Sequence, residues 1–123
     1  MISYASVNQE SFTEENWITG NKPIQTTPVR FAAGLTLPAR AVVGVVTATG
    51  EAKLSLSAAN DGSQIPRYIT AIPVDTSLGA KDAAVYLEGC FNPDLLVLGT
   101  GHTGASVKLP LQDHGLYLQK PLN

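Results

Sequence analysis

AANDGSQIPRYITAIPVD, residues 58–75, is the stretch that decides the fold, because it joins a dense turn signal to a strand-like run. At residues 60–62, Asn and Asp can bond their own backbone, and the Gly that follows can take positive φ at little cost. β-Branched and aromatic residues fill residues 68–72 apart from one Ala, and Pro66 and Pro73 on either side exclude a long helix. We therefore predict a tight turn followed by a strand.

The segments on the amino-terminal side of this stretch predict a hairpin. Residues 41–49, AVVGVVTAT, are rich in β-branched residues, and Gly50 closes them in a turn. Apolar and polar residues then alternate over residues 52–58, as in a strand with one face toward a core. In that pattern Lys53 and Ser55 face away from the core.

The carboxyl-terminal side predicts two more strands and little helix. Residues 83–88 form one strand with Val85 and Leu87 pointing inward, and residues 115–119 form the last strand. A short helix is expected to begin at residues 92–94, NPD, which offer a capping amide, a proline at the first helical position and an acid near the positive dipole end. Because the chain holds 11 Gly and 8 Pro, the body should be mainly β.

Residues 1–28 differ from the rest of the chain and predict an N-terminal arm. They are rich in Ser, Thr, Asn, Gln and Glu with isolated apolar residues, which is not the composition of a core element. The large apolar side chains among them are Tyr4, Phe12, Trp17 and Ile18. Two outcomes are open, because a segment that cannot bury these groups alone either folds back on the body or binds another molecule.

Length and composition indicate one domain with a modest core. A chain of 123 residues is near the size at which oligomerisation often adds burial. Only 15% of the residues are charged, the formal net charge is −2 and no basic run occurs, so binding to a nucleic-acid backbone is not expected. Arg30, Arg40 and Arg67 are scattered among apolar runs, where solvated or paired surface charges are usual and a buried role at an interface is the alternative.

Cys90 gives information on the redox state of the compartment in which the protein resides. As the single cysteine it cannot form an intramolecular disulfide, which favours a reducing compartment, and we expect a buried apolar side chain instead of a reactive thiol. No positively charged start leads into an apolar stretch, and no apolar run approaches the roughly 20 residues that a bilayer requires. We therefore expect neither export by a standard signal nor a membrane span.

Two motifs resemble parts of ligand sites but are incomplete. Residues 99–104, GTGHTG, have the glycines of a phosphate-binding loop, yet they lack the Lys-Ser/Thr ending and no long helix is expected after them. Residues 60–62 resemble the start of a calcium loop, but residues 63–74 contain no Asp or Glu. No nucleotide, metal ion or other cofactor is therefore expected.

Catalysis is not expected either. A hydrolase could use Ser63 or Ser106 with His102 or His114, but no serine lies on a nucleophile elbow, and the two histidines lack a third ligand at zinc spacing. No two carboxylates have a spacing that suggests a general acid and base. A hydrolase is the most distant alternative.

Three segments have a distinctive order and spacing: residues 37–77, LPARAVVGVVTATGEAKLSLSAANDGSQIPRYITAIPVDTS; residues 85–93, VYLEGCFNP; and residues 114–118, HGLYL. The turn DGSQ at residues 61–64 and the step GCFN in the second segment are among the most distinctive details. Over about residues 30–118 the chain thereby resembles the head decoration proteins of lambda-like tailed phages.

The resemblance implies a non-enzymatic structural protein of the virion that uses no cofactor. It implies homotrimers that bind the major capsid protein at three-fold positions on the outside of the expanded capsid and stabilise the shell against packed DNA. It also implies a mainly β fold, a small β-clip-like or incomplete-barrel domain with at most one or two short helices and an extended N-terminal arm. Such a protein is made in the host bacterial cytoplasm and has no nucleic acid, membrane or small-molecule substrate as a partner.

The arm is assigned to capsid contact by its position in the chain. Residues 1–28 form the capsid-contacting arm and residues 29–123 the β-rich decoration domain. The expected capsid-binding residues are Tyr4, Phe12, Trp17 and Ile18. The alternative from another class is a small β-sandwich or barrel that binds ligands or carbohydrates, for which one Trp, four Tyr and three Phe are few aromatic residues.

Overall fold

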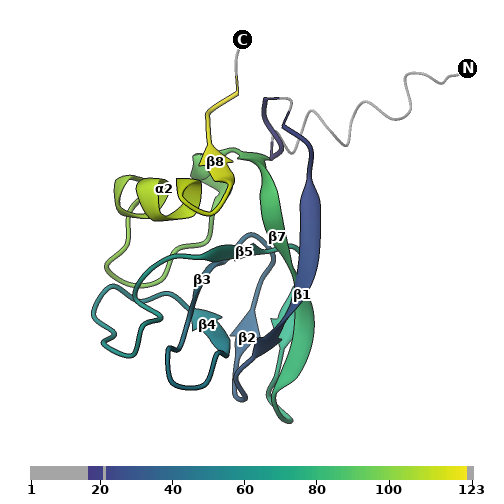
Figure 1. The fold of residues 1–123 in the computed structure, drawn as a ribbon, viewed down its shortest axis with the longest axis vertical. Coiled ribbons are helices and arrows are strands. Elements are labelled where there is room, and N and C mark those ends of the chain that lie inside the picture. Colours follow the sequence, from purple (N-terminus) through teal and green to yellow (C-terminus); the bar gives the residue numbers. More distant parts are fainter. Residues whose placement is uncertain (1–16, 21, 122–123) are drawn as a thin grey trace, which may run out of the picture.

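Five strands close into a barrel in the computed structural model of the protein, which describes residues 17–20 and 22–121. Around the barrel the strands follow the order β1 (Gln25–Phe31), β4 (Ala52–Leu54), β3 (Val42–Val45), β5 (Tyr68–Thr70) and β7 (Lys81–Phe91). β7 then pairs with β1, which completes the ring (Figure 1). The expected mainly β domain is confirmed, and its barrel is closed where an incomplete one was expected.

The remaining elements lie outside this ring. β8 (Leu116–Leu118) pairs in parallel with the carboxyl end of β7, and β2 (Thr36–Leu37) forms a separate small sheet with β6 (Val74–Asp75). The α-helix α2 (Gly104–Gln112) lies beside β8, and the 3-10 helix η1 (Pro93–Leu95) follows β7 (Figure 1).

The short helix and the last strand lie where the sequence predicted them. η1 begins after Asn92, whose Oδ1 accepts a hydrogen bond from Asp94 N at 3.0 Å. β8 occupies the centre of the predicted strand at residues 115–119. Local signals, a cap with a following proline and an apolar run after a glycine, were sufficient here.

The predicted hairpin is present as β3 and β4, which pair antiparallel with Val43 opposite Leu54. β4 is shorter than predicted and ends at Leu54. The prediction that Ser55 faces away from the core is wrong, because Ser55 is fully buried. Its Oγ lies 3.1 Å from His102 Nε2 and its N–H donates to Val42 O at 3.1 Å, so hydrogen bonds offset the burial of its polar groups.

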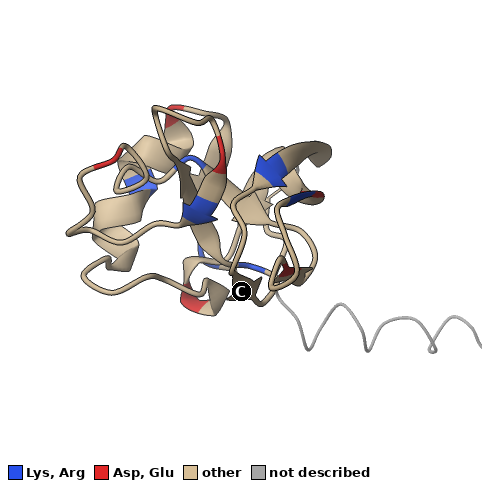
Figure 2. Ribbon diagram, turned by 90° about the horizontal axis from the view of Figure 1, so that it is seen from below, with Lys and Arg blue, Asp and Glu red and all other residues tan. Residues whose placement is uncertain are grey.

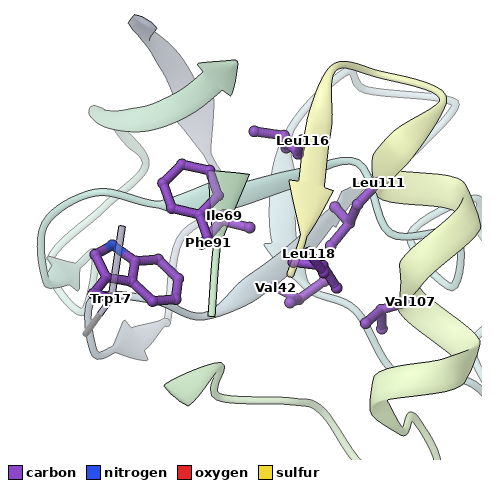
Figure 3. Close-up of a cluster of buried hydrophobic side chains, with 8 residues drawn as sticks. All are labelled: Trp17, Val42, Ile69, Phe91, Val107, Leu111, Leu116 and Leu118. Atoms are coloured by element: carbon purple, nitrogen blue, oxygen red, sulfur yellow. The ribbon is translucent and has the colours of Figure 1, made fainter. Parts of the chain in front are cut away.

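β7 separates two hydrophobic clusters and contributes side chains to both. Val85, fully buried as predicted, packs inside the barrel with Phe31 and Val43, whereas Tyr86 packs against a second cluster. The second cluster, drawn in Figure 3, consists of Trp17, Val42, Ile69, Phe91, Val107, Leu111, Leu116 and Leu118. The strand therefore couples the barrel to the layer that α2 covers.

Leu87 is 42% exposed, so the prediction that it points inward is wrong. The register between β1 and β7 shifts at this point, because Thr26 pairs with Tyr86 and Gln25 with Glu88. Leu87 is the extra residue between these two pairs. Such a bulge changes the alternation of faces along a strand, which a period of two residues cannot anticipate.

The predicted turn at residues 60–62 is confirmed. Asp61 Oδ1 accepts hydrogen bonds from Ser63 Oγ at 2.6 Å and from Ser63 N at 3.0 Å. These bonds favour the ionised carboxylate and lower the pKa of Asp61 from 3.8 to about 2. Gly62 has a φ of +103°, and a Cβ at this position would collide with Thr47 Oγ1.

The nine-residue helix α2 was not predicted. A capping box sets its start, because Thr103 Oγ1 accepts a hydrogen bond from Ser106 N at 3.2 Å while Ser106 Oγ accepts one from Thr103 N at 2.9 Å. Val107 and Leu111, four positions apart, are fully buried and hold the helix against the second cluster. Pro110 inside the helix and the glycines before it concealed this pattern in the sequence.

Candidate functional site

Residues 17–20 lie against the carboxyl end of β7 and are called the root segment below. Trp17 O accepts a hydrogen bond from Asn92 N at 2.8 Å. Thr19 N donates to Cys90 O at 3.0 Å. The root segment thereby pairs with β7 as a short strand would, and its backbone is fixed to the body.

The root segment and β8 flank the end of β7 from opposite sides. Ile18 forms an antiparallel bridge with Phe91, whose O accepts a hydrogen bond from Gln119 N at 2.9 Å on the other side. Thr19 Oγ1 also donates to Gln119 O at 2.9 Å. Both ends of the described chain therefore meet at one end of the molecule, as Figure 1 shows.

The side chain of Trp17 is only 5% exposed and belongs to the second cluster (Figure 3). Its ring stacks on Phe91 with centroids 4.9 Å apart and planes inclined by 28°, and its Nε1 donates to the Tyr86 hydroxyl at 3.2 Å. The Arg40 guanidinium lies 5.0 Å from the centre of the Trp17 ring, within range of a cation–π interaction. Stacking, a hydrogen bond and a cation thus hold the same indole.

Two of the four predicted capsid-binding residues, Trp17 and Ile18, lie in the part of the chain that the structure describes. Tyr4 and Phe12 lie outside the described residues. Trp17 follows the first of the two open outcomes, since it folds back on the body, whereas Ile18 is 53% exposed. Their assignment to capsid contact stays a prediction.

Two residues that hold Trp17 were missed by the sequence analysis. Tyr86 is 69 positions away along the chain, and Arg40 was expected to be a solvated or paired surface charge, with a buried interface role as the alternative. No local pattern links either residue to Trp17. The barrel alone brings them together. The division of the chain at residue 28 also stays a prediction, although β1 already begins at Gln25.

A small surface of apolar and charged side chains adjoins the root segment. Lys22 Nζ lies 3.8 Å from Glu88 Oε2 and 5.4 Å from the centre of the Tyr117 ring. Ile24 and Tyr117 are each 37% exposed. Ile24 lies so close to Gly89 that a Cβ there would come within 2.8 Å of its Cδ1. Just before β1 begins, the chain thus passes close to Gly89 of β7.

His102 joins three parts of the chain through hydrogen bonds. Its Nε2 lies 3.0 Å from Gln64 O and 3.1 Å from Ser55 Oγ, and its Nδ1 lies 2.9 Å from Ser106 Oγ. Because a carbonyl oxygen only accepts, the bond to Gln64 assigns the proton to Nε2. The ring therefore connects the glycine-rich loop to the turn region and to the buried serine after β4.

Of the candidate hydrolase residues, the structure brings one Ser–His pair together, since Ser106 Oγ lies 2.9 Å from His102 Nδ1. Ser63 bonds Asp61 in the turn, and Ser106 bonds Thr103 in the capping box of α2. Within residues 17–20 and 22–121, the hydrogen-bond partners of His102 include no carboxylate that would orient it as a base. The bonds that His102 and these serines make connect the turn at residues 60–62, the glycine-rich loop and the start of α2.

Two hollows on the described surface do not have the lining of a carbohydrate site. One, of about 570 Å³, is lined by Pro93, Asp94, Gly104, Ala105, Lys108, Leu118, Gln119 and Lys120. Another, of about 360 Å³, is lined by Val45, Val46, Thr47, Gly50, Gly62, Ile65, Arg67 and His114. Neither lining includes Trp, Tyr or Phe, the side chains on which sugar rings stack.

Charge and metal-binding groups are dispersed over the described part of the chain. Figure 2 shows Lys and Arg interspersed with Asp and Glu. No group of three or more His, Cys, Asp or Glu among the described residues could hold a metal ion. Likewise, in this part of the chain no helix has the length and apolar character needed to cross a membrane.

Comparison with protein families shows to which family the chain is similar. The family model described as bacteriophage lambda head decoration protein D matches residues 7–112. The matched region includes the barrel, the root segment and α2, and it starts well before residue 30, where the resemblance noted from the sequence begins. No curated protein matches the chain.

Proposed function

The chain belongs to the family of the bacteriophage lambda head decoration protein D, and on that premise we propose that it binds the outside of the expanded capsid as trimers at three-fold positions. Family membership gives it a capsid decoration role in the virion. The proposal adds the partner, the major capsid protein, and the consequence, a shell that resists the pressure of packed DNA. It involves no catalytic step, cofactor or nucleic acid.

We propose that the residues before the root segment make the contact with the shell. The root segment carries this proposal, because its backbone bonds to β7 fix the place on the body where residues 1–16 join it in the chain. Tyr4 and Phe12 supply large apolar side chains in that stretch. The family match supports its importance, since it extends back to residue 7.

Three arms on one trimer would bind much more tightly than one. If an arm buries roughly 300 Å² of apolar surface, the gross gain at about 25 cal/mol per Å² is on the order of 7 kcal/mol. Ordering the arm and losing translational freedom consume a large part of that gain. Once one arm is bound, the other two bind intramolecularly, so avidity raises the affinity without new contacts.

Deletion of residues 1–16 tests the arm. The shortened protein retains Trp17 and should keep the stability and the oligomeric state of the full chain, but it should not co-sediment with expanded capsids. A matched variant of full length, with Tyr4→Ser and Phe12→Ser, shows how much of the binding depends on apolar contact. Binding by the deletion variant equal to that of the full chain would overturn the arm assignment.

Sedimentation tests the trimer. We expect a trimer either free in solution or on the shell, with three copies per three-fold position. A protein that is monomeric in both settings contradicts the avidity argument, whether or not it binds capsids.

A further inference from the structure

We propose that Trp17 is an anchor that stays in the body when the arm binds the shell, so that it positions the arm and does not itself contact the capsid. This inference rests on the proposed function of the arm. It separates Trp17 from the residues before position 17, to which the proposed function gives the contact with the shell.

The side chain of Trp17 has no surface to offer a partner while it is docked. Phe91 stacks on the ring, Arg40 lies over it at 5.0 Å, and the ring N–H bonds the Tyr86 hydroxyl. Only 5% of the residue is exposed. To reach the shell, the indole would have to leave this site and expose apolar rings that it now covers.

The backbone on both sides of the indole resists such a movement. Release of Trp17 would break its bond to Asn92 and, with the next two residues, the bond from Thr19 N to Cys90 O. It would also break the bond from the Thr19 hydroxyl to Gln119, which attaches the root segment to the strand beyond β7. The groups of Cys90, Asn92 and Gln119 that take part in these hydrogen bonds have these partners only while the root segment is docked.

A docked root gives the arm a fixed origin. The reach of a tethered segment is counted from its attachment point, and the effective concentration at the target falls as a flexible tether grows longer. An origin at residue 17 keeps each arm shorter than an origin at the start of β1 would. The barrel therefore presents the arm from a defined place, which favours simultaneous binding at a symmetric site.

A disulfide that locks the root segment provides the test. A Cβ built on Gly20 would lie 3.4 Å from the Cβ and 3.1 Å from the Sγ of Cys90, close to the Cβ–Cβ distance of a disulfide, about 3.5–4.5 Å. The full-length variant Gly20→Cys is compared in its oxidised and reduced forms. Gly20→Ser is the matched control for the positive φ of +62° at this position.

We expect the oxidised form to bind expanded capsids with a Kd within about twofold of both the reduced form and Gly20→Ser. An oxidised form that binds about tenfold or more weakly, with affinity restored by reduction, would show that the root must open and would overturn the anchor. If the wild-type protein itself does not bind, the proposed function fails and the anchor inference falls with it. The two failures are thus distinguishable.

A second measurement covers the case in which the disulfide does not form. Trp17 is the single tryptophan, so 5-hydroxytryptophan incorporated into this protein can be excited separately from the tryptophans of the shell. We expect its emission maximum and its quenching by acrylamide to be the same free and capsid-bound. A red-shifted emission or a several-fold rise in quenching on binding would overturn the proposal.

Discussion

The indole N–H of Trp17 donates a hydrogen bond to the Tyr86 hydroxyl at 3.2 Å, across 69 positions of sequence. This contact joins a segment that has the composition of an arm to the strand shared by both hydrophobic clusters. The amino-terminal side of the barrel therefore depends on Trp17, a residue that the sequence analysis assigned to contact with the capsid.

Trp17→Ala should therefore lower the free energy of unfolding by about 3–5 kcal/mol, the usual cost of replacing a large buried aromatic side chain by alanine. The neighbouring Ile18 is 53% exposed, and Ile18→Ala should change stability by no more than about 0.5 kcal/mol. Chemical denaturation of the two variants decides the point. Equal losses would mean that Trp17 is not part of the core.

Gly62→Ala should destabilise the protein by about 1–3 kcal/mol or more, because a positive φ is strained for alanine and the new Cβ meets Thr47 Oγ1. Gly50 is a matched control: its φ is +76°, but a Cβ there meets nothing within 4 Å. Gly50→Ala should lower the free energy of unfolding by about 1 kcal/mol, the cost of the positive φ alone. Thermal or urea unfolding that ranks the two variants in the opposite order would contradict the collision.

Asp61 should make stability depend on pH in the acid range. Hydrogen bonds from Ser63 lower its pKa in the folded protein from 3.8 to about 2, so its contribution is complete above about pH 4 and is lost as the pH falls toward 2. In Asp61→Asn the fall of Tm between pH 4 and 2 should be shallower. Asp75, whose pKa is lowered by bonds from Ser77, acts in the same direction and supplies part of the remaining slope. An unchanged slope would contradict the role of Asp61.

His102→Ala should lower the free energy of unfolding by about 1–3 kcal/mol, because the fully buried Ser55 and the carbonyl of Gln64 lose a hydrogen-bond partner. His114→Ala, at an exposed position, should be nearly neutral. Denaturation midpoints of the two variants give the comparison. Similar costs at both positions would show that the His102 bonds do not stabilise the loops.

Sequence signals were reliable where a local pattern decided the structure. The turn at residues 60–62, the hairpin of β3 and β4, and the cap of η1 depend on residues a few positions apart. Each was predicted from side chains that bond their own backbone or from alternation over a short run.

The errors and omissions of the sequence analysis arise where contacts between segments far apart in the chain determine the structure. β1, QTTPVRF, is polar and contains Pro28, and it becomes a strand because β7 pairs with it from Gln25 to Phe31. Leu87 is turned outward by the bulge in that same pairing. Of the candidate site, only the positions of the large apolar residues could be read from the sequence. Which of them the body covers depends on Tyr86, Phe91 and Arg40, and no local rule connects these to Trp17.

Closure of the barrel has a consequence for proteins crowded together on one surface. Open sheet edges offer unpaired backbone groups on which a neighbouring copy can build, and they lead to aggregation. Here β1 and β7 satisfy each other, and the strands that remain outside the ring in the described chain, β2, β6 and β8, are only two or three residues long. The described part of the chain therefore offers a neighbouring copy on the same surface no long open edge on which to extend a sheet.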